Sequence, residues 1–217
     1  MKILITRPEP DASIDAEYYR NQGHSVTIVP LLQILPLPPV GEVEHREGEG
    51  RPIWIFISKN AVRYFPLPWR EKVKDWRTFA VGPSTAQLLQ EQGFQNVLAP
   101  STQEGSEALL ALPELQNVKD QSFVIVRGTE GRELLADTLR ARGATVNYLP
   151  VYEARPTELT PAQLTQLRQP YDQIILTSMP ILKRALTLGI SKHAGLLVLS
   201  HKMVEVAARQ GWRVLLR

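Results

Sequence analysis

Short apolar runs alternate with polar, helix-patterned stretches along most of the chain. The runs Lys2–Thr6 (KILIT) and Ser122–Val126 (SFVIV) are short enough to be buried strands. After the second run, apolar residues recur at helical spacing over Leu134–Leu139, and Gly143 provides a helix stop. A second strand pattern, Thr145–Pro150 (TVNYLP), follows directly. Strand, helix and strand joined by a short crossover predict parallel pairs in an α/β sheet.

The same pattern occurs twice in the chain, with a constant offset of 120 residues. Residues 6–36 align with residues 126–156, so that Arg7 falls on Arg127. The correspondence continues at offsets of 120 and then 118 in the paired segments Ile53–Val62 with Gln173–Leu182, and Phe79–Leu98 with Leu197–Leu216. An offset kept over several elements indicates an internal duplication. Generic α/β patterning is the alternative, and it would not preserve the offset.

Two segments bounded by prolines interrupt this pattern. Pro30–Pro39 (PLLQILPLPP) and Pro150–Pro156 (PVYEARP) are typical of extended connectors, because proline at both ends keeps a segment out of a central sheet. Two connectors in one chain predict two crossings between two lobes. The Gly- and Glu-rich segment Gly41–Pro52 is expected to be a solvated loop.

Composition narrows the class of protein. The chain has 217 residues, of which 43% are hydrophobic and 22% charged, as in ordinary globular proteins. The absence of cysteine excludes disulfides, thiolate nucleophiles and Cys-ligated metals. The apolar run before Arg7 is too short for a signal peptide, so a cytoplasmic protein is expected. The net charge of +3 favours anionic partners, but the basic residues form no tract, which argues against nucleic-acid binding. No apolar stretch approaches the length of a membrane span, so no membrane partner is expected.

The candidate chemistry lies where the apolar strands end. The sequence has no G-x-S-x-G, Walker A or G-x-G-x-x-G motif, and its four histidines lack metal-ligand spacing. Several strands instead end in small polar or basic clusters that open a helix: Thr6–Pro8, Ser58–Asn60, Gly82–Thr85, Arg127–Thr129, Thr177–Ser178 and Ser200–Lys202. Such clusters either cap the helix or bind an anion at its free N–H groups. In open parallel sheets they share the carboxyl edge, which predicts a wide anion-binding site.

A series of motifs in these same places resembles a known family. In chain order they are ITRP, FISKNAV, FAVGPSTAQLL, VRGTEGRELLADTLRARGATV, PVYEARP and IILTS. Together they resemble the uroporphyrinogen-III synthases, and the resemblance covers nearly the whole chain. It implies two similar flavodoxin-like, parallel-sheet α/β lobes. Residues 1–30 and 157–217 would form one lobe and residues 40–148 the other, with residues 31–39 and 149–156 as a two-stranded connector.

The resemblance also implies a reaction. Members of the family cyclise hydroxymethylbilane to uroporphyrinogen III, with loss of water and inversion of the last pyrrole ring through a spiro intermediate, and use no cofactor and no metal. The substrate carries an acetate and a propionate on each ring, which suits a site with many anion-binding junctions. The enzyme that forms hydroxymethylbilane is a candidate partner, and a monomer is expected.

One residue breaks the repeat and is the candidate catalytic acid. Tyr152 falls on Leu32 at the offset of 120, and inversion of a single ring requires something that the two halves do not share. Its phenol could protonate the departing hydroxyl, the role that the resemblance also implies; the alternative is a packed ring whose O–H binds water or backbone. The candidate substrate-binding residues are Arg7, Ser58, Lys59, Asn60, Thr85, Arg127, Arg132, Ser178 and Ser200.

Two other classes of function stay open. A two-lobed, non-catalytic binding protein could capture a polyanionic small molecule with the same junctions, although such proteins are usually exported. A regulatory α/β domain is the third possibility, but the strand ends lack a clear acidic phosphorylation pocket.

Overall fold

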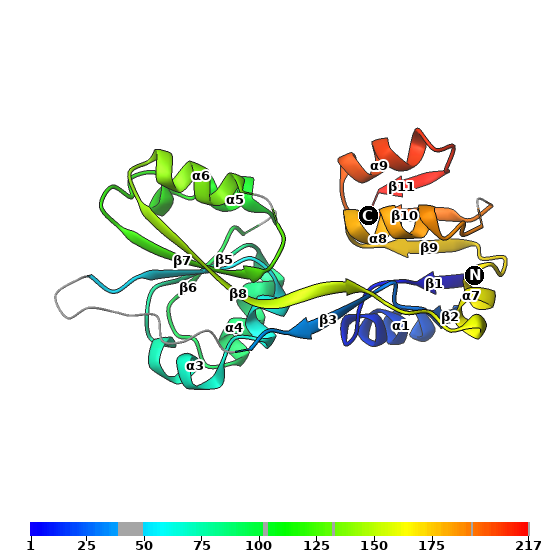
Figure 1. The fold of residues 1–217 in the computed structure, drawn as a ribbon, viewed down its shortest axis with the longest axis horizontal. Coiled ribbons are helices and arrows are strands. Elements are labelled where there is room, and N and C mark those ends of the chain that lie inside the picture. Colours follow the sequence, from blue (N-terminus) through cyan, green and yellow to red (C-terminus); the bar gives the residue numbers. More distant parts are fainter. Residues whose placement is uncertain (39–49, 102–103, 132, 192, 217) are drawn as a thin grey trace. The chain divides into compact units, whose positions relative to one another are not determined.

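The chain forms two α/β units, each around its own sheet (Figure 1). The computed structural model describes residues 1–38, 50–101, 104–131, 133–191 and 193–216. One unit consists of Met1–Ile34 and Arg155–Arg217, and the other of Leu35–Ala154. The chain therefore passes from the first unit to the second and back again.

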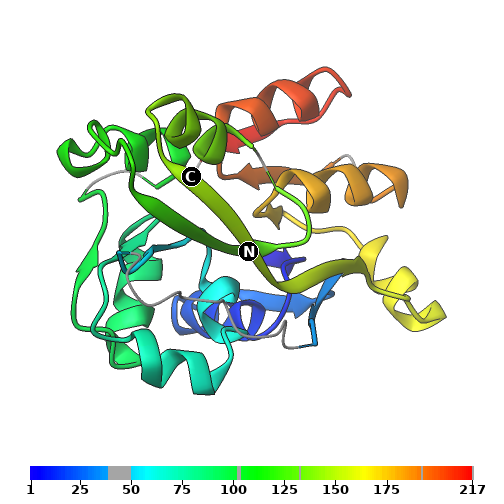
Figure 2. The same cartoon turned by 60° about the vertical axis from the view of Figure 1, so that its left-hand side comes forward.

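A five-stranded parallel sheet forms the first unit, with strand order β11-β10-β9-β1-β2. The strands are β1 (Lys2–Ile5), β2 (Ser25–Ile28), β9 (Gln173–Leu176), β10 (Gly195–Val198) and β11 (Val214–Leu216). The helices are α1 (Asp11–Asn21), α7 (Pro161–Leu167), α8 (Met179–Thr187) and α9 (His201–Ala208). Because side chains alternate along a strand, Ile3 and Ile5 pack against α1, while Leu4 packs in the cluster that α7, α8 and α9 cover (Figure 2).

The second unit has six strands in the order β3-β8-β7-β4-β5-β6. They are β3 (Leu32–Pro36), β4 (Ile53–Phe56), β5 (Thr78–Ala80), β6 (Val97–Leu98), β7 (Ser122–Gly128) and β8 (Thr145–Pro156). The helices are α2 (Lys59–Arg63), α3 (Leu67–Val73), α4 (Pro83–Glu91), α5 (Ser106–Leu110) and α6 (Leu134–Ala141), with a 3₁₀ turn at Pro113–Leu115. Ile55 and Ile125 pack under α5 and α6, and Phe56 and Val126 pack on the opposite face.

The two sheets share one strand order, which accounts for the repeat. Strands β11-β10-β9-β1-β2 correspond to β6-β5-β4-β7-β8. Ile3 lies opposite Gln173, and Phe123, which follows Ile3 by 120 positions, lies opposite Ile53, which precedes Gln173 by 120. The same offset therefore relates both the residues and the register in which their strands pair.

The offset of 118 is wrong for the last strand of each sheet. Phe79 lies opposite Leu98, whereas Leu197, its counterpart, lies opposite Leu215 and not Leu216. The turn before β11 is one residue shorter than the turn before β6, because β11 follows Gly211 sooner than β6 follows Gly93.

The sequence predicted that prolines would keep both proline-bounded segments out of a central sheet, but both contribute to the six-stranded sheet, as β3 at its edge and as part of β8. β8 is one continuous strand from Thr145 to Pro156, and Pro150 lies opposite Arg127 inside its pairing with β7. The register then shifts, so that Gly128 lies opposite Tyr152. A proline has no N–H to donate, and a bulge is one of the places where a sheet accepts it.

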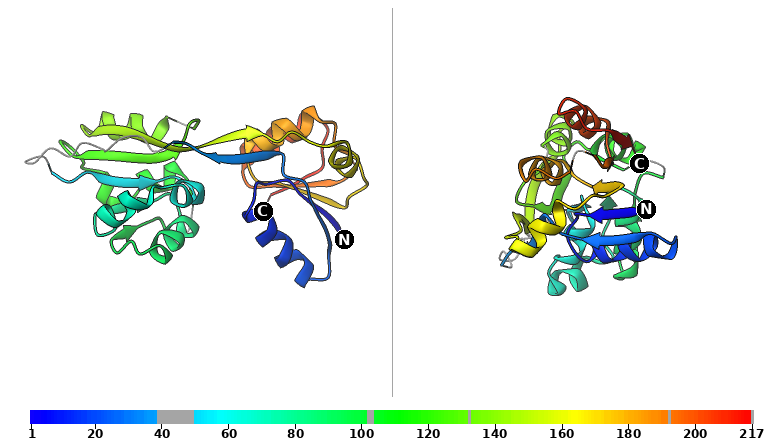
Figure 3. Two further views of the ribbon diagram at one scale, coloured as in Figure 1. Left: turned by 60° about the horizontal axis from the view of Figure 1, so that its bottom comes forward. Right: turned by 90° about the vertical axis from the view of Figure 1, so that its right-hand side faces the viewer.

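The later part of β8 pairs with β3, at the edge of the six-stranded sheet (Figure 3). The N–H of Leu37 donates to the carbonyl of Val151, and the N–H of Thr157 donates to the carbonyl of Leu31. Residue numbers rise along one strand as they fall along the other, so this pair is antiparallel. The predicted loop Gly41–Pro52 lies largely outside the described residues. In the described part of the chain, no helix is long and apolar enough to cross a membrane.

Candidate active site

Three of the predicted serines cap helices. Ser58, Ser178 and Ser200 have extended backbone and accept hydrogen bonds from backbone N–H groups of α2, α8 and α9, at 3.0, 3.5 and 3.4 Å. The sequence folds this way because a buried strand must leave the sheet at a polar residue that satisfies the free N–H groups of the next helix. Capping, which the sequence left as an alternative, is thus realised at all three junctions.

Ser58 makes a second contact, with the phenol of Tyr152. The two oxygens lie 3.1 Å apart, and either can be the donor. Because the Ser58 oxygen already accepts from the Ala61 N–H, its own hydrogen is available to Tyr152. Strand β7 separates β4 from β8 in the sheet, so residues 94 apart in sequence meet above its carboxyl end.

Backbone on β7 and an aromatic ring hold the Tyr152 side chain. A Cβ at Gly128 would come within 2.8 Å of the Tyr152 ring, so any other residue there would push the ring away. The Thr129 N–H donates to the Tyr152 carbonyl at 3.0 Å, and the ring of Tyr64 lies 6.2 Å away, tilted by 37°. Tyr152 is half-buried, and these contacts hold its ring in place.

Arg127 is buried and its guanidinium is enclosed by its own loop. Its relative solvent exposure is 5%. It forms an ion pair with Glu133 at 3.0 Å, donates from Nε to the Gly128 carbonyl at 3.2 Å, and lies 4.6 Å from the centre of the Tyr148 ring. Arg132, another predicted binding residue, lies outside the described residues.

Glu133 and Tyr148 complete this cluster. The Tyr148 hydroxyl donates to Glu133. This hydrogen bond, with the one from Arg127, holds the pKa of the Glu133 carboxyl below its usual value. Burial raises the pKa of the Tyr148 phenol, and the bond to Glu133 raises it further. The pair therefore stays in its carboxylate and phenol forms at neutral pH.

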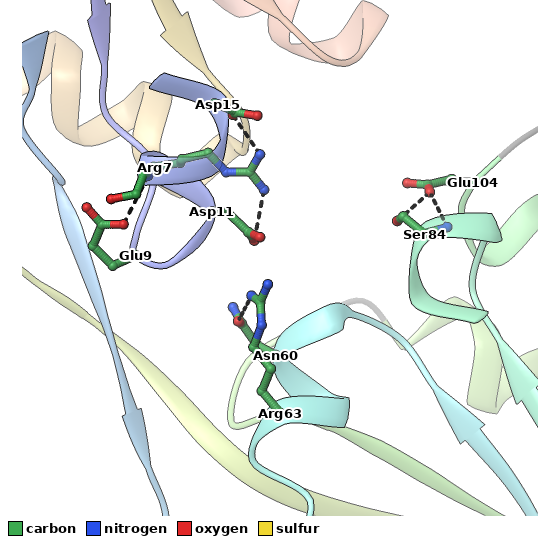
Figure 4. A network of polar contacts seen from close by, with 9 residues as sticks. Arg7, Glu9, Asp11, Asp15, Asn60, Arg63, Ser84 and Glu104 are labelled. Atoms are coloured by element: carbon green, nitrogen blue, oxygen red, sulfur yellow. Dashed lines mark hydrogen bonds and ion pairs between the residues drawn. The ribbon is translucent and has the colours of Figure 1, made fainter. Parts of the chain in front are cut away.

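The remaining predicted residues of the second unit differ in exposure. Thr85, in the first turn of α4, retains only 3% of its exposure, and Lys59 and Asn60 on α2 are half-buried. The side-chain oxygen of Asn60 accepts a hydrogen bond from the Arg63 guanidinium at 3.1 Å. The exposed side chain beside Thr85 is Ser84, whose hydroxyl donates to Glu104 at 2.8 Å (Figure 4).

Arg7 lies in the first unit, in the segment between β1 and α1, and contacts two carboxylates of α1. It binds Asp11 at 3.1 Å and Asp15 at 2.8 Å, and its side chain is 21% exposed (Figure 4). Its positive charge is therefore compensated locally. Sequence reasoning missed both aspartates, although Asp11 and Asp15 are four positions apart on α1 and share one of its faces.

Other residues of the site had weaker signals in the sequence. Glu133 and Tyr148 are 15 positions apart on different elements, and nothing local relates them. Gly128 was visible in the sequence only as part of the polar cluster Arg127–Thr129. Tyr64, which lies against Tyr152, carried no signal apart from its place after FISKNAV.

A comparison with protein families decides the classification. The family model described as "Uroporphyrinogen-III synthase HemD" matches residues 15–216. The chain belongs to the uroporphyrinogen-III synthase family. Among curated relatives, it is 31% identical to the uroporphyrinogen-III synthase of Escherichia coli K12, over 98% of this chain and 93% of that one. It is 33% identical to that of Proteus mirabilis, over 70% and 80% of the two chains.

Solved structures of uroporphyrinogen-III synthases share the fold. The Helicobacter pylori enzyme superposes with a TM-score of 0.68 at 17% identity, covering 99% of this chain and 91% of that one. A mutant of the Thermus thermophilus enzyme gives a TM-score of 0.60 at 14% identity, covering 100% and 91%. The family fold therefore persists where most side chains differ.

Proposed function

We propose that this protein is a uroporphyrinogen-III synthase that cyclises hydroxymethylbilane to uroporphyrinogen III in haem biosynthesis, and that Tyr152 is its general acid. The family match over residues 15–216 supports the reaction. The observation that carries the role of Tyr152 is its phenol oxygen, which lies 3.1 Å from the Ser58 hydroxyl at the end of a half-buried side chain. A general acid must be fixed in position and reachable by the group that it protonates.

The first step breaks the bond between the terminal methylene carbon and its hydroxyl. The electron pair leaves with the oxygen, which takes the Tyr152 proton and departs as water. The carbon becomes electrophilic and is stabilised by the adjoining pyrrole. The substituted carbon of the last ring then attacks it, which forms the spiro intermediate that ring inversion requires. The bond from that carbon to its original methylene then breaks, which makes this second methylene electrophilic, and the free carbon on the other side of the same pyrrole attacks it. The proton that this carbon loses as the pyrrole regains aromaticity restores the phenol.

Ser58 stabilises the phenolate that this step creates. Its oxygen accepts from the Ala61 N–H at 3.0 Å, which leaves its hydrogen to donate to the Tyr152 oxygen. A hydrogen bond to a charged acceptor is worth about 1.5–3 kcal/mol. Ser58 therefore favours proton transfer by stabilising the charged form of Tyr152.

The substrate carboxylates bind at the strand-to-helix junctions. In the second unit, the segments after β4, β5 and β7 lie at the carboxyl edge of one parallel sheet, the usual ligand edge of such folds. The proposed binding residues are Arg7, Ser58, Lys59, Asn60, Thr85, Arg127, Arg132, Ser178 and Ser200. Arg127 and Thr85 are buried, so they contribute through the backbone that they shape.

Location and partners rest on family membership alone. We place the enzyme in the cytoplasm as a monomer that receives hydroxymethylbilane from the enzyme that makes it. Gel filtration of the purified protein, with and without that enzyme, tests both the monomer and the partner.

Product analysis tests the reaction. Hydroxymethylbilane is incubated with the protein or with heat-inactivated protein, the products are oxidised, and uroporphyrins I and III are separated by chromatography. The active protein should give mainly isomer III, whereas the inactivated control gives the spontaneous isomer I. Isomer I alone, together with measurable binding of uroporphyrinogen III, would support the alternative of a non-catalytic polyanion-binding protein.

A further inference from the structure

We infer that Arg127, Glu133 and Tyr148 form a clamp that fixes the loop Gly128–Gly131 and thereby positions Tyr152. The role in catalysis rests on the proposed function; the structural role does not. All three are positioning residues, because they act on Tyr152 through this loop.

The loop is built around the Arg127 guanidinium. Nε binds the Gly128 carbonyl at 3.2 Å, at the start of the loop. A Cβ at Gly131 would come within 2.6 Å of an Arg127 amino nitrogen, so the end of the loop packs on the same group. The buried cation thus touches both ends of a four-residue turn, and a side chain at Gly131 would leave it no room.

Glu133 and Tyr148 fix the guanidinium in turn. Glu133 binds it at 3.0 Å, and the Tyr148 ring lies beneath it at 4.6 Å while the Tyr148 hydroxyl donates to Glu133. Burying a cation away from water is costly unless its N–H groups find hydrogen-bond acceptors. Arg127 retains 5% of its exposure, so this geometry depends on both partners.

The loop then fixes Tyr152 by two contacts. The Thr129 N–H donates to the Tyr152 carbonyl at 3.0 Å, and the Gly128 backbone lies directly under the ring. A shift of the loop would therefore move the phenol away from Ser58. Displacements of about 1 Å can cost about 100-fold in rate.

Amide hydrogen exchange at Thr129 tests the clamp without any substrate. The variants are Arg127→Lys and Glu133→Gln, with Arg142→Lys as the matched control. Arg142 is also an anchoring arginine, since it donates to the carbonyls of Leu110 and Leu115 at 3.0 and 2.7 Å, but it contacts neither the loop nor Tyr152 in the described structure. We expect exchange at Thr129 to rise about tenfold or more in both test variants and to stay unchanged in the control.

A double-mutant cycle tests the link to catalysis. Arg127→Lys should lower kcat for isomer III about tenfold in the wild-type background, with KM little changed, and less than about twofold in a Tyr152→Phe background. Unchanged exchange at Thr129 in both Glu133→Gln and folded Arg127→Lys would overturn the clamp, and equal kcat losses in both backgrounds would overturn its action through Tyr152. If the wild-type protein makes no isomer III, the proposed function fails, and exchange at Thr129 still decides the clamp.

Discussion

The phenol oxygen of Tyr152 lies 3.1 Å from the hydroxyl of Ser58, the residue that caps α2. One serine therefore ends a helix and orients a candidate acid. The repeat equivalent of Ser58 is Ser178, which caps α8, but the position equivalent to Tyr152 is Leu32. The duplication thus supplies the cap in both units and the phenol in only one.

Replacing Ser58 with alanine should reduce both stability and turnover. Loss of the cap should cost about 1 kcal/mol of unfolding free energy. Loss of the hydrogen bond to the phenolate should lower kcat about tenfold. Thr160→Ala is the control, because Thr160 caps α7 with a capping box and belongs to no proposed site. It should lose similar stability and keep full kcat; equal kcat in the two variants would remove Ser58 from the mechanism.

Replacing Gly128 with alanine should displace the Tyr152 ring. The added Cβ would lie 2.8 Å from the ring, closer than atoms can approach, so the phenol must move away from Ser58. We expect kcat to fall by about 10- to 100-fold. Gly50→Ala is the control, since its Cβ would meet nothing within 4 Å. If both variants turn over at the wild-type rate, the position of the ring is not limiting.

The pKa of Glu133 should lie below the usual pKa of a glutamate, which is about 4.3. Its pKa is lowered first by the hydrogen bond from Tyr148 and then by Arg127, with Arg140 of α6 adding a smaller effect. A lowered folded-state pKa gives stability that is present above the unfolded pKa and is lost as pH falls through the folded one. Tyr148→Phe should raise the Glu133 pKa and move this acid loss of stability to higher pH.

Carboxyl-carbon NMR of Glu133, followed through an acid titration, measures this shift. The same samples should be followed by circular dichroism, which reports acid unfolding. An identical Glu133 titration in wild type and Tyr148→Phe would show that the hydroxyl does not bind the carboxylate.

Replacing Arg7 with alanine should destabilise the protein rather than simply remove charge. Arg7 compensates Asp11 and Asp15, whose side chains are 11% and 16% exposed. Loss of these two ion pairs should lower the free energy of unfolding by about 1–3 kcal/mol. Lys183→Ala, at an exposed position of α8, should change it by less than about 0.5 kcal/mol. Urea unfolding measures both, and equal stabilities would show that the two ion pairs contribute nothing.

Much of the fold follows from the sequence because its signals are local or repeated. An apolar run ending at Ser58 marks a strand and the cap of the next helix, and the offset between halves carries the strand order from one sheet to the other. The position of Pro150 inside β8 could not be predicted, because the bulge that accommodates it arises from pairing with β7.

The candidate site was less predictable because its contacts are distant in sequence. Ser58 and Tyr152 are 94 positions apart and meet only because β7 lies between their strands. Thr85 was misjudged for a different reason. Its place after a strand predicted that it would contact a ligand, but the rotation of α4 about its axis turns Thr85 inward and leaves Ser84 exposed. Helical phase relative to a core depends on packing, which a short motif does not contain.

The most direct test of the account is the kcat of Tyr152→Phe for conversion of hydroxymethylbilane to isomer III. The substitution keeps the ring over Gly128 and removes only the hydroxyl that contacts Ser58. With folding verified by circular dichroism, we predict a loss of kcat on the order of 100-fold, while isomer I accumulates at the spontaneous rate. Full kcat for isomer III in this variant would contradict the role of Tyr152 as the acid.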